Sequence, residues 1–103
     1  MTFDEYQKQA WSYALPTAKS NQYLLPGLAG EVGELHSLFA KCLRDRTFFD
    51  PMDLKKELGD ILWFVSGLAL YHGIPLSEIA DKNIEKLESR KQRNKIEGSG
   101  DDR

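Results

Sequence analysis

The chain has 103 residues, of which 41 % are hydrophobic and 29 % charged, which is the composition of one small folded domain rather than of a disordered or multidomain protein. Its 16 acidic and 14 basic residues give a formal net charge of −2, so electrostatics gives no reason to bind a nucleic acid polymer or an anionic membrane. The chain has a single cysteine and an N-terminus without a basic and apolar leader, which argues against a disulfide-stapled secreted protein. The longest nearly apolar run, residues 61–71, is too short to span a membrane. We therefore expect a cytoplasmic protein.

The expected elements are all helical, because apolar residues recur at helical spacing and no alternating stretch is long enough for a strand. A capping box of Thr2 and Glu5 starts the first helix, which Pro16 ends. A second helix is expected from about residues 24–26 to about residue 44. Its glycines are poor helix formers and indicate a close approach of a neighbour or a ligand; they are Gly27, Gly30 and Gly33.

The pair Asp50-Pro51 supplies the N-cap and the first residue of a third helix, which ends before Gly73. A fourth helix opens near Pro75 and fades around residue 93. We therefore expect an antiparallel bundle of about four helices in a single domain over residues 1–93, followed by a flexible C-terminal tail over residues 94–103.

Acidic residues interrupt the apolar stripes of the second and third helices. On a helical wheel, Glu57 lies in the middle of the apolar stripe of its helix, and Asp60 lies about 60° away on the same side. Glu31 occupies the same place among the leucines of the second helix, with Glu34 beside it. Two successive helices joined by a short turn pack antiparallel, so the four carboxylates are expected to converge.

Converging carboxylates in a partly dry site raise one another's pKa, and a hard divalent cation resolves that conflict. Ligands that are all oxygen favour Mg²⁺, with Mn²⁺ as a substitute, and Mg²⁺ commonly binds substrate phosphates as well. A single Glu-x-x-Glu pair is usually a solvated face, but two pairs centred on apolar stripes reverse that expectation. A di-iron site would require Glu-x-x-His pairs, which the chain lacks.

Two segments resemble the E-x-x-E and E-x-x-D motifs of the MazG-type nucleoside triphosphate pyrophosphohydrolases: Gly30-Glu31-Val32-Gly33-Glu34-Leu35 and Glu57-Leu58-Gly59-Asp60. Residues 81–90 are similar to the last motif of that family, and the matches together span residues 27–93. Gly30 is a departure, because many members have a further Glu there, and it leaves open the number of metal ions and the identity of the general base. The single short module resembles small phage-encoded members, which act in the host cytoplasm.

The resemblance implies the all-α NTP pyrophosphatase fold and Mg²⁺-dependent hydrolysis of a (deoxy)nucleoside triphosphate to monophosphate and pyrophosphate, with water attacking the α-phosphate. It implies catalytic and metal-binding roles for Glu31, Glu34, Glu57 and Asp60. It also implies that Asn83, Lys86 and Arg90 bind substrate, and these three share one stripe of the fourth helix with Arg93.

Self-association is expected as well, since the third helix is apolar nearly all round between residues 61 and 71, more than its neighbours in so small a chain can cover. A homodimer or a homotetramer fits both this surface and the family. Two alternatives stay open: a non-catalytic helical dimerisation or adaptor module on the same fold, and a related pyrophosphohydrolase acting on dUTP, phosphoribosyl-ATP or ppGpp.

Overall fold

The computed structural model describes all 103 residues as helices and their connections, without a strand. A short 3-10 helix, η1, lies between the first two of four α-helices. The elements are α1 (Phe3–Trp11), η1 (Pro16–Ala18), α2 (Asn21–Asp45), α3 (Pro51–Tyr71) and α4 (Leu76–Gln92). The expectation of an all-α chain with four helices is confirmed. None of the helices is long and apolar enough to cross a membrane.

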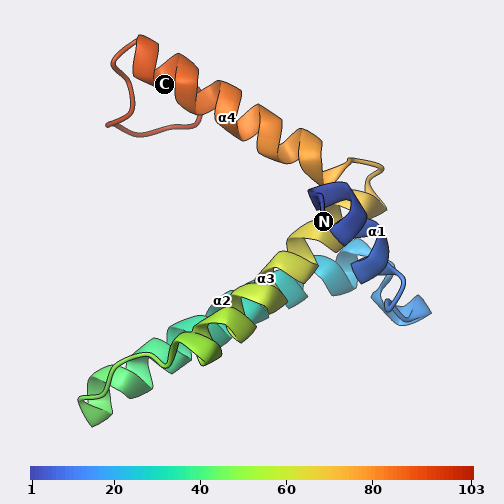
Figure 1. Ribbon diagram of the computed structural model, residues 1–103, viewed down its shortest axis with the longest axis vertical. Coiled ribbons are helices and arrows are strands. Elements are labelled where there is room, and N and C mark those ends of the chain that lie inside the picture. Colours follow the sequence, from blue (N-terminus) through green and yellow to red (C-terminus); the bar gives the residue numbers. More distant parts are fainter.

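The two longest helices, α2 and α3, lie side by side and antiparallel, and together they form an extended arm (Figure 1). Arg46 ends α2 in the left-handed conformation, with φ 56°. After a short connection the carboxylate of Asp50 accepts a hydrogen bond from the backbone N–H of Met52 at 2.9 Å, which caps α3 as expected. This tight connection fixes the faces that the two helices present to each other.

The start of α2 differs from the expectation, because the helix begins at Asn21 and includes Pro26. The hydroxyl of Ser20 accepts a hydrogen bond from the backbone N–H of Tyr23 at 3.2 Å and caps the helix there. The missing N–H of Pro26 costs the helix one backbone hydrogen bond. The predicted start was therefore too late, because it took the proline as the place where the helix begins.

The short helix α1 packs across α3 and connects it to the start of α4. The expected capping box is present: Thr2 N–H donates to the Glu5 carboxylate at 3.0 Å, and Glu5 N–H donates to the Thr2 hydroxyl at 3.1 Å. The amide of the buried Gln7 donates to the carbonyl of Ser66 at 3.2 Å, and its oxygen accepts from the N–H of Leu76 at 3.0 Å. One side chain thus joins three helices through fully satisfied polar groups.

The small core lies where α1, α2 and α3 meet. Leu24 is completely buried. Gly27 allows α2 to approach α3 closely, and Gly67 allows α3 to approach α1 closely. A Cβ atom added at Gly27 would lie 2.2 Å from Cε1 of Phe64, and one at Gly67 would lie 2.7 Å from Cζ3 of Trp11. Gly27 therefore makes the close approach that its sequence position indicated, and its neighbour is the phenyl ring of α3.

The fourth helix leaves the other three after its first turns (Figure 1). It contacts α1 and α3 and makes no contact with α2. The radius of gyration is 16.4 Å, against about 13 Å for a typical domain of about 100 residues. The accessible surface is 7876 Å², where a compact protein of this size exposes about 5,900 Å². A single chain therefore leaves a large surface uncovered.

Candidate metal centre

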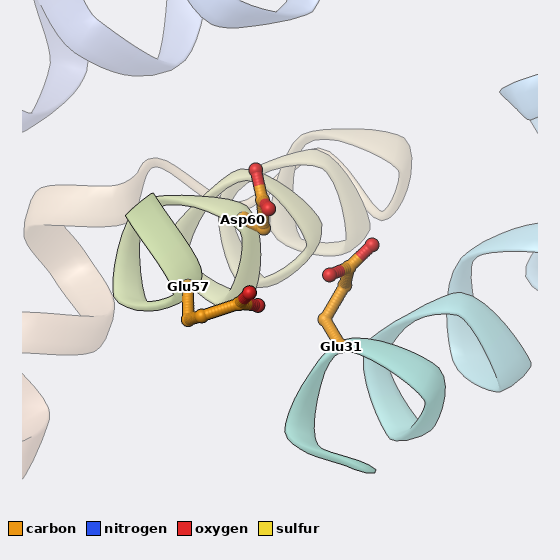
Figure 2. Close-up of side chains that lie close together, drawn as sticks. All are labelled: Glu31, Glu57 and Asp60. Carbon is orange, nitrogen blue, oxygen red and sulfur yellow. The ribbon is translucent and has the colours of Figure 1, made fainter. Parts of the chain in front are cut away.

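Three carboxylates from two helices meet on the arm formed by α2 and α3. Glu31 comes from α2, and Glu57 and Asp60 come from α3, with one ligand oxygen of each residue within 4.8 Å of the others. Figure 2 shows Glu57 of α3 and Glu31 of α2 extending into the space between the two helices, with Asp60 beside them on α3. The spacing of three between Glu57 and Asp60 places both on the α3 face that meets α2. The predicted convergence of acids from the two helices is thus realised for these three residues.

The three acids repel one another, and no basic side chain of the chain compensates them. Burial raises the pKa of Glu31 above its ordinary value, and the negative charges of Asp60, Glu57 and Glu34 raise it further. None of the ion pairs in the chain includes any member of this group. A group of acids held together without a counter-charge is under electrostatic strain that a bound cation would relieve.

The donor set fits a hard divalent cation. All three ligand groups offer carboxylate oxygens, which Mg²⁺ and Mn²⁺ prefer, and neither histidine nor cysteine belongs to the group. Glu31 and Glu57 are half-buried, whereas Asp60 is exposed to solvent. The cluster is therefore open on the Asp60 side, where an ion with its water molecules and a phosphate-bearing ligand have access.

Glu34, the fourth acid nominated from the sequence, lies outside this group of three. It is exposed, one turn after Glu31 on α2. It is close enough for its charge to raise the pKa of Glu31, and both residues line the same cavity. Glu34 is thus a neighbour of the cluster whose carboxylate stays free of it.

The shared cavity has a volume of about 470 Å³, within the range of small-molecule sites. Besides the two acids it is lined by Gln22, Tyr23, Pro26, Gly27, Gly30 and Phe64. The ring of Tyr23 stacks on that of Phe64 with centroids 5.9 Å apart, and Tyr23 is 47 % exposed. An aromatic face and an amide therefore line the same cavity as Glu31 and Glu34.

Tyr6 of α1 also belongs to the surroundings of the cluster. Burial raises the pKa of its hydroxyl, and the negative charge of Asp60 raises it further. No signal in the sequence indicates that Tyr6 lies near Asp60, because their proximity results from the packing of α1 across α3. Tyr23 was one of several aromatic residues in the sequence, and no motif distinguishes it from those that fill the core.

The substrate-binding residues nominated on α4 do not join the acids. Asn83, Lys86 and Arg90 lie on the part of α4 that runs away from α2 and α3 (Figure 1). Lys86 instead forms an ion pair with Asp101 at 2.7 Å. Arg90 is buried beneath the segment 94–103 and donates to the main-chain oxygen of Asp101. Within one chain, the acidic and the basic groups of the expected site are separate.

Comparison with known proteins links both groups to one family. The model of the MazG nucleotide pyrophosphohydrolase domain matches residues 19–94, a range that contains the acids of α2 and α3 and the basic residues of α4. The Gene 37 protein of Mycobacterium phage L5 is 44 % identical over 85 residues, which cover 79 % of this chain and 75 % of the phage protein. No solved structure matches the chain.

Proposed function

This chain belongs to the MazG nucleotide pyrophosphohydrolase family and is a small phage-like member of it, and we propose that it hydrolyses (deoxy)nucleoside triphosphates to monophosphate and pyrophosphate with Mg²⁺. The observation that carries this proposal is the uncompensated group of three carboxylates across α2 and α3. Mn²⁺ is expected to substitute for Mg²⁺, because both prefer oxygen ligands.

Glu31, Glu57 and Asp60 are the residues that would hold the metal ion. The chemistry that Mg²⁺ supplies at such a site is neutralisation of phosphate oxygens and stabilisation of pyrophosphate as the leaving group. The three acids lie on two helices fixed by a short connection, so they hold the site in one geometry before the substrate arrives. Such preorganisation is what phosphoryl transfer requires of a protein.

Glu34 is the acid that we propose as general base. It stands outside the group of three, which leaves its oxygens free to accept a proton, and it shares the cavity with Glu31. Water attacks the α-phosphorus while its proton passes to Glu34, and a new P–O bond forms. The bond from the α-phosphorus to the bridging oxygen breaks, and pyrophosphate leaves with that electron pair.

The cavity beside the acids would hold the nucleoside. The half-exposed ring of Tyr23 offers a stacking surface for a nucleobase, and the amide of Gln22 offers a donor and an acceptor to the edge of that base. The distance from cavity to acids is short, since Glu31 and Glu34 themselves form part of its lining. The site proposed for the base therefore adjoins the carboxylates proposed to act at the α-phosphate.

A second copy of the chain would complete the site. A triphosphate carries several negative charges, and the cavity beside the acids is lined by no basic residue. The cations of α4 pair with Asp101 and not with the acids of their own chain, and α4 makes no contact with α2. We propose a homodimer, alone or paired into a tetramer, in which Asn83, Lys86 and Arg90 of one copy bind the phosphates held by the other. The uncovered surface of the single chain supports this assembly. Residues 61–70 of α3, where uncovered apolar surface was expected, are however buried or half-buried within the chain.

The experiment that tests the proposal is pyrophosphate release from a panel of ribo- and deoxynucleoside triphosphates, with dUTP, phosphoribosyl-ATP and ppGpp included. We expect release that depends on Mg²⁺ and that falls by at least about 100-fold in Glu57→Gln. Asp53→Asn, which removes an exposed acid of the same helix, is the matched control and should retain activity. Absence of release from every compound would favour the non-catalytic adaptor module.

A further inference from the structure

The segment 94–103 lies against the basic face of α4, and its Asp101 binds the same residues that are proposed to bind substrate phosphate. Lys86 Nζ lies 2.7 Å from Oδ1 of Asp101, and Nη2 of Arg90 lies 3.4 Å from the same oxygen. Arg90 also donates to the main-chain oxygen of Asp101. A single carboxylate is thus held by two cations on one helix face, which is how proteins bind a phosphoryl group.

The segment 94–103, which the sequence indicated as a flexible tail, folds along a path that presents Asp101 to these cations. The guanidinium of Arg103 donates to the carbonyls of Lys95 at 3.1 Å, Ile96 at 3.0 Å and Gly100 at 2.6 Å. Gly98 turns the chain back with φ 116°, a conformation that residues with a side chain rarely adopt. Figure 1 shows the segment as a loop that returns along the end of α4.

A cavity lies beside this contact, between the segment and α4. Its volume is about 520 Å³, and its polar lining consists of Glu78, Lys82, Asn83, Lys86 and Asp101. Asp101 therefore contributes to the wall of a hollow that contains two ammonium groups and an amide. Arg90, with an exposed fraction of 6 %, keeps its Nε without a hydrogen-bond partner, so the segment does not use all the donors that this face offers.

The contacts of Asp101 with its two cations are ones that a stronger anion can displace. The side chain of Asp101 is 77 % exposed and that of Lys86 is 38 % exposed, and exposed ion pairs contribute little to stability. The side chain of Arg90 is only 7 % exposed, but its distance to the Asp101 carboxylate is the longer one, 3.4 Å. A phosphoryl group carries more negative charge than a carboxylate and offers three oxygens rather than two. Exchange of one anion for the other would leave Lys86 and Arg90 paired throughout.

We propose that the segment 94–103 is an internal competitor for substrate: the carboxylate of Asp101 occupies the phosphate-binding residues of α4, and a polyphosphate must displace it to bind. This inference rests on the proposed function in one respect, namely that Lys86 and Arg90 bind substrate phosphate. It adds that the chain regulates its own affinity for polyphosphates through this segment.

The test is isothermal titration calorimetry of inorganic tripolyphosphate with the full chain, as wild type, Asp101→Asn and Asp102→Asn. Both substitutions remove one negative charge at adjacent positions, but only Asp101 is bonded to α4. We expect Asp101→Asn to tighten binding by about two- to fivefold, the range of an exposed ion pair, and Asp102→Asn to leave the dissociation constant unchanged. Equal effects of the two substitutions, or weaker binding by Asp101→Asn, would overturn the proposal.

A second measurement separates this inference from the proposed function. In the hydrolysis assay, Asp101→Asn should lower KM for the nucleotide without changing kcat, because it removes competition and leaves the acids untouched. Tighter tripolyphosphate binding without any nucleotide hydrolysis would contradict the proposed function and support the competitor. Normal hydrolysis with unchanged KM and unchanged tripolyphosphate binding would contradict the competitor alone.

Discussion

Glu31 and Asp60 lie close together on two different helices, and the charge of Asp60 raises the pKa of the Glu31 carboxyl more than the charge of any other residue does. Only burial raises the pKa of Glu31 more. The two side chains are brought together by the antiparallel packing of α2 and α3, and both are held without a basic partner. This relationship has a measurable consequence for stability and for metal binding.

The first prediction concerns the pH dependence of the metal-free protein. The pKa of Glu31 is raised in the folded state above its ordinary value of about 4.5, so the folded state favours the protonated form. The stabilisation from this group is present below about pH 4.5 and is lost as pH rises through the folded-state pKa. Glu31→Gln should therefore unfold at a higher urea concentration than wild type at pH 7.

The comparison must be between the two proteins at each pH, because Asp4 has a pKa that hydrogen bonds from Ser77 lower, and its contribution has the opposite sign. The stability difference between Glu31→Gln and wild type should shrink as pH falls toward 4.5, since wild-type Glu31 then becomes neutral too. A difference that is the same at pH 4.5 and pH 7, in the absence of metal, would mean that the negative charge of Glu31, disfavoured by burial and by the neighbouring acids, is not its cause.

The second prediction separates the general base from the metal ligands. Glu34→Gln should lower kcat by about 10²- to 10⁴-fold, the usual contribution of a general base, and should leave Mn²⁺ binding intact. Loss of Mn²⁺ binding in Glu34→Gln would instead make Glu34 a metal ligand.

The third prediction tests whether two chains share one site. Asp60→Asn removes an acid of α3, and Lys86→Gln removes a cation of α4, so each variant alone should be inactive. In an equimolar mixture that exchanges subunits, half of the dimers contain both variants, and one of the two sites in each has every residue intact. We expect activity of about a quarter of the wild-type value. A mixture as inactive as its components would contradict the shared site.

The fourth prediction compares two glycines of α2. Gly27→Ala should destabilise the chain by about 1–3 kcal/mol, as overpacking does, because its Cβ would lie 2.2 Å from Cε1 of Phe64. At Gly33 no atom of the chain lies within 4 Å of an added Cβ, and Gly33→Ala should gain up to about 1 kcal/mol from helix propensity. Urea unfolding of both variants measures the contrast, and similar destabilisation by both would show that Gly33 is packed against a second copy.

Local signals in the sequence predicted much of the helical structure. The capping box at Thr2, the N-cap at Asp50 and the turn at Gly73 lie where the residue types alone indicated. The start of α2 was misplaced because Ser20 caps the helix and Pro26 is accommodated inside it. Capping is a local interaction that the sequence can reveal, but two competing local signals must be weighed by the packing around them.

The site divides in the same way. The helical periodicity predicted that four acids of α2 and α3 would meet, because face and packing follow from spacing. Glu31, Glu57 and Asp60 do so, whereas Glu34 lies outside the group. The direction of α4 could not be predicted, since it depends on the hydrogen bonds that the buried Gln7 makes to α3 and to the start of α4. The contact of Asp101 with α4 likewise depends on how the segment 94–103 folds back onto α4, which no periodic pattern in the sequence predicts.

The most direct test of the metal centre is the binding of Mn²⁺ measured by electron paramagnetic resonance at pH 7, with wild type, Glu57→Gln and the control Asp53→Asn. We predict that wild type and Asp53→Asn bind Mn²⁺ with the same affinity, that Mg²⁺ displaces it from both, and that Glu57→Gln loses most of this binding. Equal binding of Mn²⁺ by Glu57→Gln and wild type would contradict a metal ion held by the acids of α2 and α3.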